Sequence, residues 1–147
     1  MILLLFPLAI QGGAMILDEA WFHRRRGLPR WERIGHPLDT LTVLICFLFV
    51  LFVPPNAKGA LAAYIALAGF SSLFITKDEW VHSKMCEPAE HWLHAILFVL
   101  HPIVFFTTAL LWRSGARTAL WVQAALIFGF GLYQLLYWSF LWKPHRP

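Results

Sequence analysis

The sequence predicts an all-α integral membrane protein with about five transmembrane helices. Of its 147 residues, 59% are hydrophobic and only 14% are charged, whereas soluble proteins carry about a quarter charged residues. The chain contains five apolar runs, most of them near the roughly 20 residues that a helix needs to cross a bilayer. All eight acidic residues fall in two short windows, residues 18–39 and 78–90. We therefore expect one membrane domain, with its acidic chemistry gathered in two places.

The five expected spans are separated by short breaks of turn-forming residues. The runs cover residues 2–22, 37–53, 60–76, 92–112 and 118–142. The breaks between them hold an arginine-rich stretch, Pro-Pro-Asn, Glu-Pro and Arg-Ser-Gly, residue types that interrupt or end helices. Tryptophans lie at or near the run ends, as expected of an interfacial aromatic belt, at positions 21, 31, 80, 92, 112, 138 and 142.

The placement of positive charge predicts the orientation. The side with the two acidic windows and the C-terminus carries nine lysines and arginines, and the opposite side carries three. Because positive residues favour the cytoplasmic side, both windows are expected at the cytoplasmic face of a bacterial-type inner (plasma) membrane. The N-terminus is then outside and the C-terminus cytoplasmic. Since the basic residues sit in short loops between apolar runs, nucleic-acid binding is not expected.

The two acidic windows align with each other. The first reads Glu-Ala-Trp-Phe-His (19–23) and then Glu-Arg-Ile-Gly-His (32–36), while the second reads Asp-Glu-Trp-Val-His (78–82) and then Glu-His-Trp-Leu-His (90–94). A proline follows the first histidine of each window by six residues. This self-similarity predicts two parallel helical-hairpin repeats, residues 1–54 and 60–112, related by a pseudo-two-fold axis along the membrane normal. Together they would form a four-helix bundle, with residues 117–142 as an extra span.

The spacing within the repeat predicts a metal site. Residues four apart lie on one face of a helix, so each of the first four helices presents one carboxylate–imidazole pair: Glu19/His23, Glu32/His36, Asp78/His82 and Glu90/His94. Such ligands suit iron, zinc or manganese, and their number suffices for two bridged ions. Without cations, four acids in a region of low dielectric constant would repel one another. The alternative is that these are acids and histidines at the wet membrane interface, with the arginines of residues 24–33 neutralising Glu32 and Asp39.

Further polar residues are candidates for supporting roles. Asp18, Glu79 and Glu87 are expected to point away from the ligands, as supporting, capping or solvated residues. His91 either pairs with Glu87 or replaces His94. Asp39 is a one-sided ligand or an arginine's partner. Cys86 has no counterpart in the first repeat, which argues against it as a ligand.

Three residues are candidates for catalytic roles. His101 lies seven residues after His94, on the same helix face and roughly 10 Å deeper. It is either functional or a neutral histidine beside the kink at Pro102. Tyr133 and Tyr137 share a face at the height of the site, as a hydrogen-bonding or redox-active wall or as interfacial anchors.

Two partial resemblances bear on the metal. The four-helix carboxylate/histidine set resembles di-iron carboxylate proteins of ferritin-like and alternative-oxidase type, although those use Glu-x-x-His. The spacing Glu19-x3-His23-x12-His36 is similar to the Asp-x3-His-x12-His metal motif found in a membrane-embedded chain of particulate methane monooxygenase. The second copy, ending at His94, is one residue shorter. These resemblances imply iron in the first case and copper in the second.

The expected function is metal-dependent redox chemistry of oxidase or oxygenase type. Two divalent ions, iron before zinc, manganese or copper, would act on a lipid-soluble substrate such as a lipid, a fatty acyl chain or a quinol. The alternatives are a zinc-dependent lipid hydrolase, a metal transporter or sensor, and a non-enzymatic partner subunit. Bis-histidine haem, held by pairs such as His94 and His101, is a further possibility.

Overall fold

The structure is a computed structural model that describes residues 2–142, except for the side chains of Asp78 and Val81. Throughout this part of the chain the regular structure is helical and no strand occurs. The elements in order are α1 (Ile2–Leu17), η1 (Asp18–His23), α2 (Arg24–Arg26), α3 (Arg30–Phe52), α4 (Ala60–Phe74), η2 (Ile75–Asp78), α5 (Glu79–Met85), α6 (Pro88–Arg113), α7 (Arg117–Leu136) and η3 (Tyr137–Leu141).

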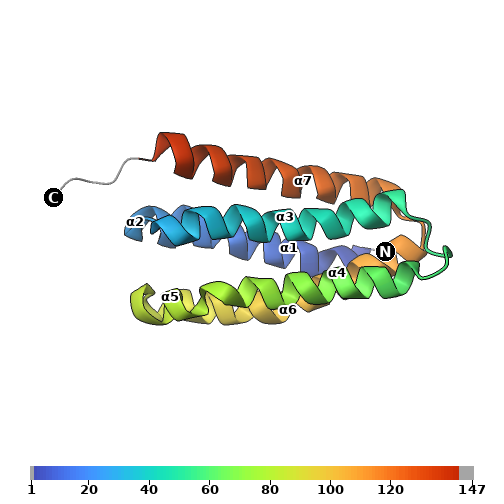
Figure 1. Ribbon diagram of the computed structural model, residues 1–147, viewed down its shortest axis with the longest axis horizontal. Coiled ribbons are helices and arrows are strands. Elements are labelled where there is room, and N and C mark those ends of the chain that lie inside the picture. The colour runs from blue at the N-terminus through green and yellow to red at the C-terminus, as the bar shows by residue number, and fades with distance from the viewer. Residues whose placement is uncertain (1, 143–147) are drawn as a thin grey trace.

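Within residues 2–142, five helical units are long and apolar enough to cross a membrane, which confirms that part of the prediction. They cover Ile2–Arg26, Arg30–Phe52, Ala60–Met85, Pro88–Arg113 and Arg117–Leu141. The first four extend beyond their apolar runs into the acidic windows, so the candidate ligands lie on helices rather than in loops. The helices run side by side, and α2 and α5 lie at the same end of the molecule (Figure 1).

The main helix contacts join the first third of the chain to the rest. α1 packs mainly against α6, and α3 packs against α4 and, most extensively, against α7. The buried core between these helices contains Phe47, Leu51, Leu111 and Leu120. Because α6 also contacts α3, α4 and α7, α3 and α6 together form the centre of the bundle.

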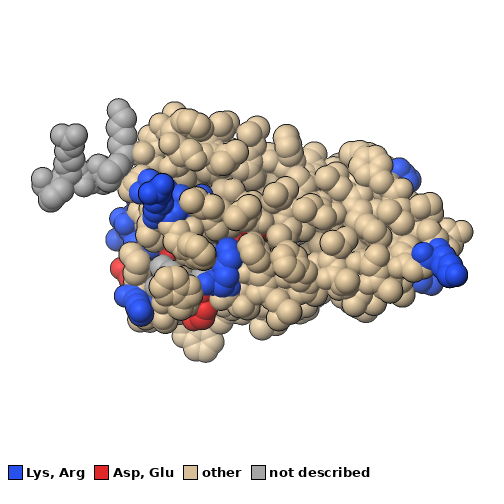
Figure 2. Space-filling view, viewed as in Figure 1, with Lys and Arg blue, Asp and Glu red and all other residues tan. Residues whose placement is uncertain are grey.

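The two ends of the bundle differ in charge. Lysines and arginines gather with the acids at the end of α2 and α5, while the opposite end shows only basic side chains (Figure 2). Four tryptophans near the acidic end are at least half exposed, as the belt prediction requires, namely Trp21, Trp31, Trp80 and Trp92. The prediction is wrong for Trp112 and Trp138, which are 4% and 1% exposed because both pack inside the bundle.

The tight turn after α2 depends on a glycine. Gly27 has φ of +75°, a left-handed conformation that other residues rarely adopt. A Cβ atom added at Gly27 would also come within 2.8 Å of the Trp142 ring. Arg33 holds the same turn, since its Nε donates to the Leu28 carbonyl at 2.8 Å while its guanidinium lies over Trp142. The turn therefore packs Trp142, which directly follows η3, against the residues that precede α3.

Candidate metal centre

A local change of helix type brings two neighbouring acids together. Residues 18–23 form a π-helix, in which hydrogen bonds join residues five apart instead of four. Asp18, five residues before His23, therefore faces the same histidine as Glu19, which is four residues before it. Asp18 Oδ2 lies 3.1 Å from His23 Nε2, and Glu19 Oε2 lies 3.3 Å from His23 Nδ1. The expectation that Asp18 points away from the site is wrong, because it assumed α-helical geometry.

One group of potential ligands joins η1 to α6. Asp18 Oδ2 also lies 3.2 Å from His94 Nε2, and Glu90 Oε1 lies 3.8 Å from His23 Nε2. Asp18, His23, Glu90 and His94 are all buried, and each offers one ligand atom within 4.8 Å of the others. Two carboxylates and two imidazoles at this separation can hold one metal ion.

A second group joins α3 to α5. Glu32 Oε1 lies 3.5 Å from His82 Nε2, and the ring centroids of His36 and His82 are 6.3 Å apart. Glu32, His36 and His82 each offer a ligand atom within 4.8 Å of the others. Asp78, the predicted fourth acid, precedes His82 by four residues, but its side chain lies outside the described part of the structure.

The two groups are adjacent. The ring centroids of His23 and His36 lie 4.7 Å apart, and those of His82 and His94 lie 4.2 Å apart. The structure thus brings all four predicted histidines together with three of the four predicted carboxylates. The arrangement offers the ligands for two ions side by side.

Glu19 is held by groups on both sides. The indole Nε1 of Trp138 donates to Glu19 Oε1, while Glu19 Oε2 faces His23 Nδ1. With both oxygens engaged, Glu19 is placed to orient His23, although it also lies within ligand distance of His23 and His36. Sequence reasoning missed Trp138 as part of the site. In the structure Gln134, four residues before Trp138, also points into the bundle, where it accepts a hydrogen bond from Thr40 at 2.7 Å.

Arg26 links the two halves of the cluster. Its Nη2 lies 2.9 Å from Glu32 Oε2 and 2.9 Å from Glu90 Oε1. This confirms one part of the alternative reading, in which a loop arginine neutralises Glu32. Among the described side chains, however, four carboxylates are at most 6% exposed, namely Asp18, Glu19, Glu32 and Glu90. Arg26 pairs with Glu32 and Glu90, and Arg24 lies beside Glu19. With neutral imidazoles these carboxylates outnumber the two guanidinium groups, which is costly unless cations bind or histidines are protonated.

The expected supporting residues lie at different places. Asp39 pairs with Lys77 at 2.7 Å rather than with an arginine. Glu87 is exposed at the start of α6, and His94, not His91, takes part in the ligand groups formed by the described residues.

Cys86 lies closer to the cluster than expected. With His82 and His94 it forms a further group within ligand distance. Burial, followed by the neighbouring charge of Glu90, raises the pKa of its thiol. This favours the protonated thiol over the thiolate that binds metals.

His101 belongs to a hydrogen-bond network deeper in the bundle. Gln11 Nε2 lies 3.2 Å from its Nδ1, and Ser71 Oγ lies 3.1 Å from its Nε2. Ser71 in turn bonds Thr42 at 2.7 Å, and the Thr42 hydroxyl donates to the Asp39 carbonyl. With both ring nitrogens engaged, His101 fits the neutral histidine of the sequence analysis and joins α1, α6, α4 and α3.

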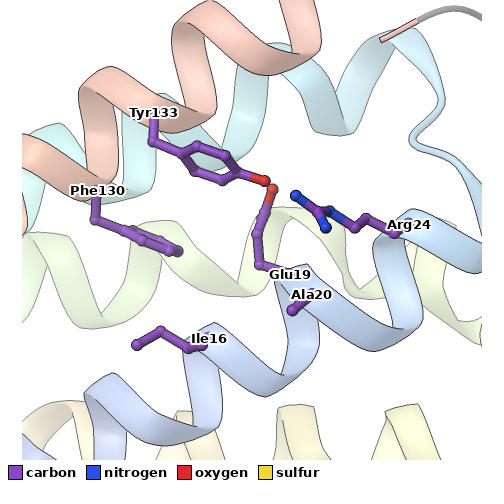
Figure 3. A pocket seen from close by; sticks show the side chains of 6 residues that line it. All are labelled: Ile16, Glu19, Ala20, Arg24, Phe130 and Tyr133. Carbon is purple, nitrogen blue, oxygen red and sulfur yellow. The ribbon is translucent and has the colours of Figure 1, made fainter.

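Tyr133 lies beside the cluster, whereas Tyr137 lies further out. Tyr133 lines a small pocket of about 270 Å³ with Glu19 and Arg24, and its hydroxyl points toward the Glu19 carboxylate (Figure 3). The Arg24 guanidinium points toward Tyr133 (Figure 3) and lies 5.2 Å from the ring centroid of Tyr137. Tyr137 stacks on Tyr133, with ring centroids 5.3 Å apart. Tyr133 is therefore the tyrosine placed to act near the cluster.

A larger cavity of about 1220 Å³ leads away from the cluster. Its polar end includes Asp18, Glu19 and the four clustered histidines, and its remaining wall is mostly apolar side chains of α1, α3, α6 and α7.

Comparison with protein-family models, curated proteins and solved structures finds no match for this chain. The function must therefore be inferred from the chemistry of its own residues.

Proposed function

We propose that this chain is an integral membrane metalloprotein with a two-metal carboxylate/histidine centre at the cytoplasmic membrane face. Five helical units of membrane-spanning length and composition support insertion. In residues 2–142, seven lysines and arginines lie near the cluster end and three lie at the other end. The positive-inside rule then places the cluster on the cytoplasmic side and the N-terminus outside.

The observation that carries the proposal is the presence of two ligand groups that share no residue. Asp18, His23, Glu90 and His94 form the first, and Glu32, His36 and His82 form the second. A single interfacial pair has many explanations, but two adjacent groups of carboxylates and imidazoles are what a dinuclear centre requires. Two divalent ions would also offset the excess negative charge of the buried carboxylates.

The matched distances support the proposed repeat. His23 lies 3.8 Å from Glu90, and its counterpart His82 lies 3.5 Å from Glu32. The His23–His94 and His82–His36 ring centroids are 6.4 and 6.3 Å apart. The first helix of each half also packs on the second helix of the other half. These equivalences are those expected of two hairpins related by a pseudo-two-fold axis, with Arg26 bridging Glu32 and Glu90.

Neighbouring residues then have defined roles. Glu19 accepts from Trp138 and faces His23 Nδ1, so that His23 Nε2 is directed at the first group. Arg26 fixes one oxygen of Glu32, leaving Oε1 directed at His82. Such outer partners set the orientation and basicity of metal ligands. The proposed roles of Asp18 and Glu19 are thus the reverse of those expected from sequence alone.

The proposed chemistry is oxidation of a lipid-soluble substrate with dioxygen as the electron acceptor and iron as the metal. Bound iron would supply the redox chemistry, because carboxylate and imidazole ligands suit it. The cluster lies at one end of a cavity whose wall is mostly apolar. This favours a substrate drawn from the membrane. Tyr133 is placed to bond a reacting group near Glu19.

Metal analysis of single variants tests the proposal. Protein purified in detergent without chelators is expected to hold about two equivalents of iron. Asp18→Ala and His94→Ala are expected to reduce the first group's occupancy, and His36→Ala and His82→Ala the second group's, so that each variant retains about one equivalent. His91→Ala, a histidine on α6 outside the groups, serves as the matched control and should retain both.

Three results would contradict the two-iron proposal. Wild-type protein without bound metal would exclude the metal centre. A single equivalent of metal in the wild type, lost equally in all four variants, would indicate one site rather than two. Stoichiometric zinc in place of iron would exclude redox chemistry at the metal. Zinc would support the second candidate, a zinc-dependent lipid hydrolase, because zinc also accepts the carboxylate and imidazole ligands of the two groups.

A further inference from the structure

The large cavity opens sideways between α1 and α7. The wall residues on α3 and α6 are buried: Val43, Phe47 and Val104 are 8%, 1% and 4% exposed. Wall residues on α1 and α7 are open to the surroundings instead, since Ile16, Val122 and Leu126 are 61%, 55% and 64% exposed. If the five helices span a membrane, this opening faces lipid.

The cluster end of the opening is bridged by polar side chains. Glu19 and Arg24 come from the chain segment that follows α1, and Tyr133 comes from α7; the three point toward one another across the gap (Figure 3). Further from the cluster, the α1 and α7 sides of the cavity are formed mostly by apolar residues, both small and large. A molecule therefore has access from the side of the bundle, at the depth of the apolar core.

Glycines keep the passage wide. Gly12 on α1 and Gly129 on α7 both line the cavity. A Cβ atom built at either position meets no other atom within 4 Å among the described residues. Since glycine weakens a helix interior by roughly 1 kcal/mol relative to alanine, glycines with no close neighbour gain nothing from packing. Their effect is to leave space beside the ligand cluster.

The charges of the wall select the kind of occupant. Of the described residues that line the cavity, none is lysine or arginine, while Asp18, Glu19 and Asp39 are acidic. Outside the ligand cluster, an anionic head would find no basic partner among the described residues of this wall, because Arg24 lines the smaller pocket instead. Neutral groups along the cavity, including Gln11 and Gln134, suit hydroxyl or carbonyl oxygens instead.

We propose that the cavity binds an uncharged amphiphile, a molecule with a long apolar tail and a head bearing hydroxyl or carbonyl oxygen, that enters between α1 and α7. This deepens the proposed function and rests on it for the role of the metal. The tail lies along the apolar wall, and the head reaches the cluster beside Tyr133. Quinones and quinols, and long-chain alcohols, both have this chemistry.

Ligand competition in the purified protein tests the selectivity. Decylubiquinone is the probe, and its quenching of tryptophan fluorescence in detergent reports binding. Hexadecanol is expected to displace it if the site accepts any neutral head, and failure of hexadecanol to compete would narrow the occupant to the quinone class. Palmitate has an anionic head and a tail as long as that of hexadecanol. Its affinity for the cavity should be at least tenfold weaker than that of whichever neutral amphiphile binds, decylubiquinone or hexadecanol. Equal or stronger competition by palmitate would overturn the proposal.

Filling the passage tests the route. Gly129→Phe and Gly12→Leu place side chains in open space and are expected to weaken decylubiquinone binding at least tenfold. Gly69→Phe is the matched control, because Gly69 on α4 also has no neighbour within 4 Å of a built Cβ but lies outside the cavity wall. Unchanged binding in both filled variants would reject the cavity as the site.

Metal content separates the two proposals. Iron is measured in the same samples, and the filled variants should retain it, because neither glycine belongs to a ligand group. Quinone binding by wild-type protein that holds no metal as purified would contradict the two-metal centre and leave the cavity proposal standing. Full metal content in protein that binds no neutral amphiphile would contradict the cavity proposal and leave the two-metal centre standing.

Discussion

The two ends of the bundle use polar groups in different ways. At the end distant from the cluster, the Tyr64 hydroxyl donates to the Phe105 carbonyl and the Trp112 indole donates to the Val53 carbonyl, both at 2.8 Å. These rings and Phe49 pack together, with centroids 5.7 to 6.4 Å apart. The polar atoms there are neutral and bond to backbone, as in an ordinary core.

The cluster end instead buries charge. Among its described side chains, Glu32 and Glu90 are 0% and 1% exposed, and Arg26 is their shared guanidinium partner. Nδ1 of His94 has no hydrogen-bond partner in the described part of the chain. Burying such groups costs free energy that apolar residues would not. One end is thus a neutral packed core, whereas the other buries charge at the proposed metal centre, and the following experiments test that contrast.

The largest expected effect comes from removing the internal cation. Arg26→Met leaves Glu32 and Glu90 without their guanidinium, and loss of one partner of a buried ion pair costs about 3–5 kcal/mol. The free energy of unfolding, measured by denaturation in mixed micelles, should fall by that amount. Arg25→Met is the control, since Arg25 is exposed over the Trp21 ring. Equal stability of the two variants would show that Arg26 does not hold the acids together.

Metal removal should have the next largest effect. An ion present at a hundredfold excess over its dissociation constant stabilises the folded state by about 2.7 kcal/mol. Chelation is therefore expected to lower the melting temperature, and added iron to restore it. The Trp112→Phe variant, altered at the opposite end, should show the same difference between metal-loaded and metal-free protein. A melting temperature that does not respond to chelator would remove the distinction between the two ends.

The fold was largely predictable from local sequence, whereas part of the site was not. Apolar runs and turn residues predict the five helical units because they act over short distances. The four-residue spacing between the acids and histidines of the repeat is also a local pattern, and the four histidines that it selects lie together in the structure. Asp18 was misplaced because a π-helix at residues 18–23 changes which residues share a face. No residue type in that segment distinguishes a π-helix from an α-helix beforehand.

Contacts between distant helices were also beyond prediction. Trp138 reaches Glu19 across 119 positions of sequence, and Arg26 reaches Glu90 across 64. Both depend on how α7 packs on α3 and how α1 packs on α6. The sequence offered several partners for each side chain, such as the membrane interface for Trp138. Only the packing selects one.

The Trp138 contact predicts a smaller effect, confined to the cluster end. Trp138→Phe keeps an aromatic ring in the core but removes the N–H that donates to Glu19. Loss of an outer partner of a metal ligand typically weakens metal binding 10- to 100-fold. Titration against a competing chelator should show this loss. Trp121→Phe, at a half-exposed position on α7, is the control; equal affinities would mean that Glu19 needs no indole to orient His23.

The smallest effect is expected at the opposite end. Tyr64→Phe removes one hydroxyl that bonds the Phe105 carbonyl, and a neutral hydrogen bond contributes about 1 kcal/mol. The ring remains packed against Trp112, so no cavity forms. The free energy of unfolding should fall by about that amount, while the metal content and the affinity from chelator titration stay those of the wild type. A loss of metal in this variant would show that the two ends are coupled, and that packing at the neutral end contributes to metal binding.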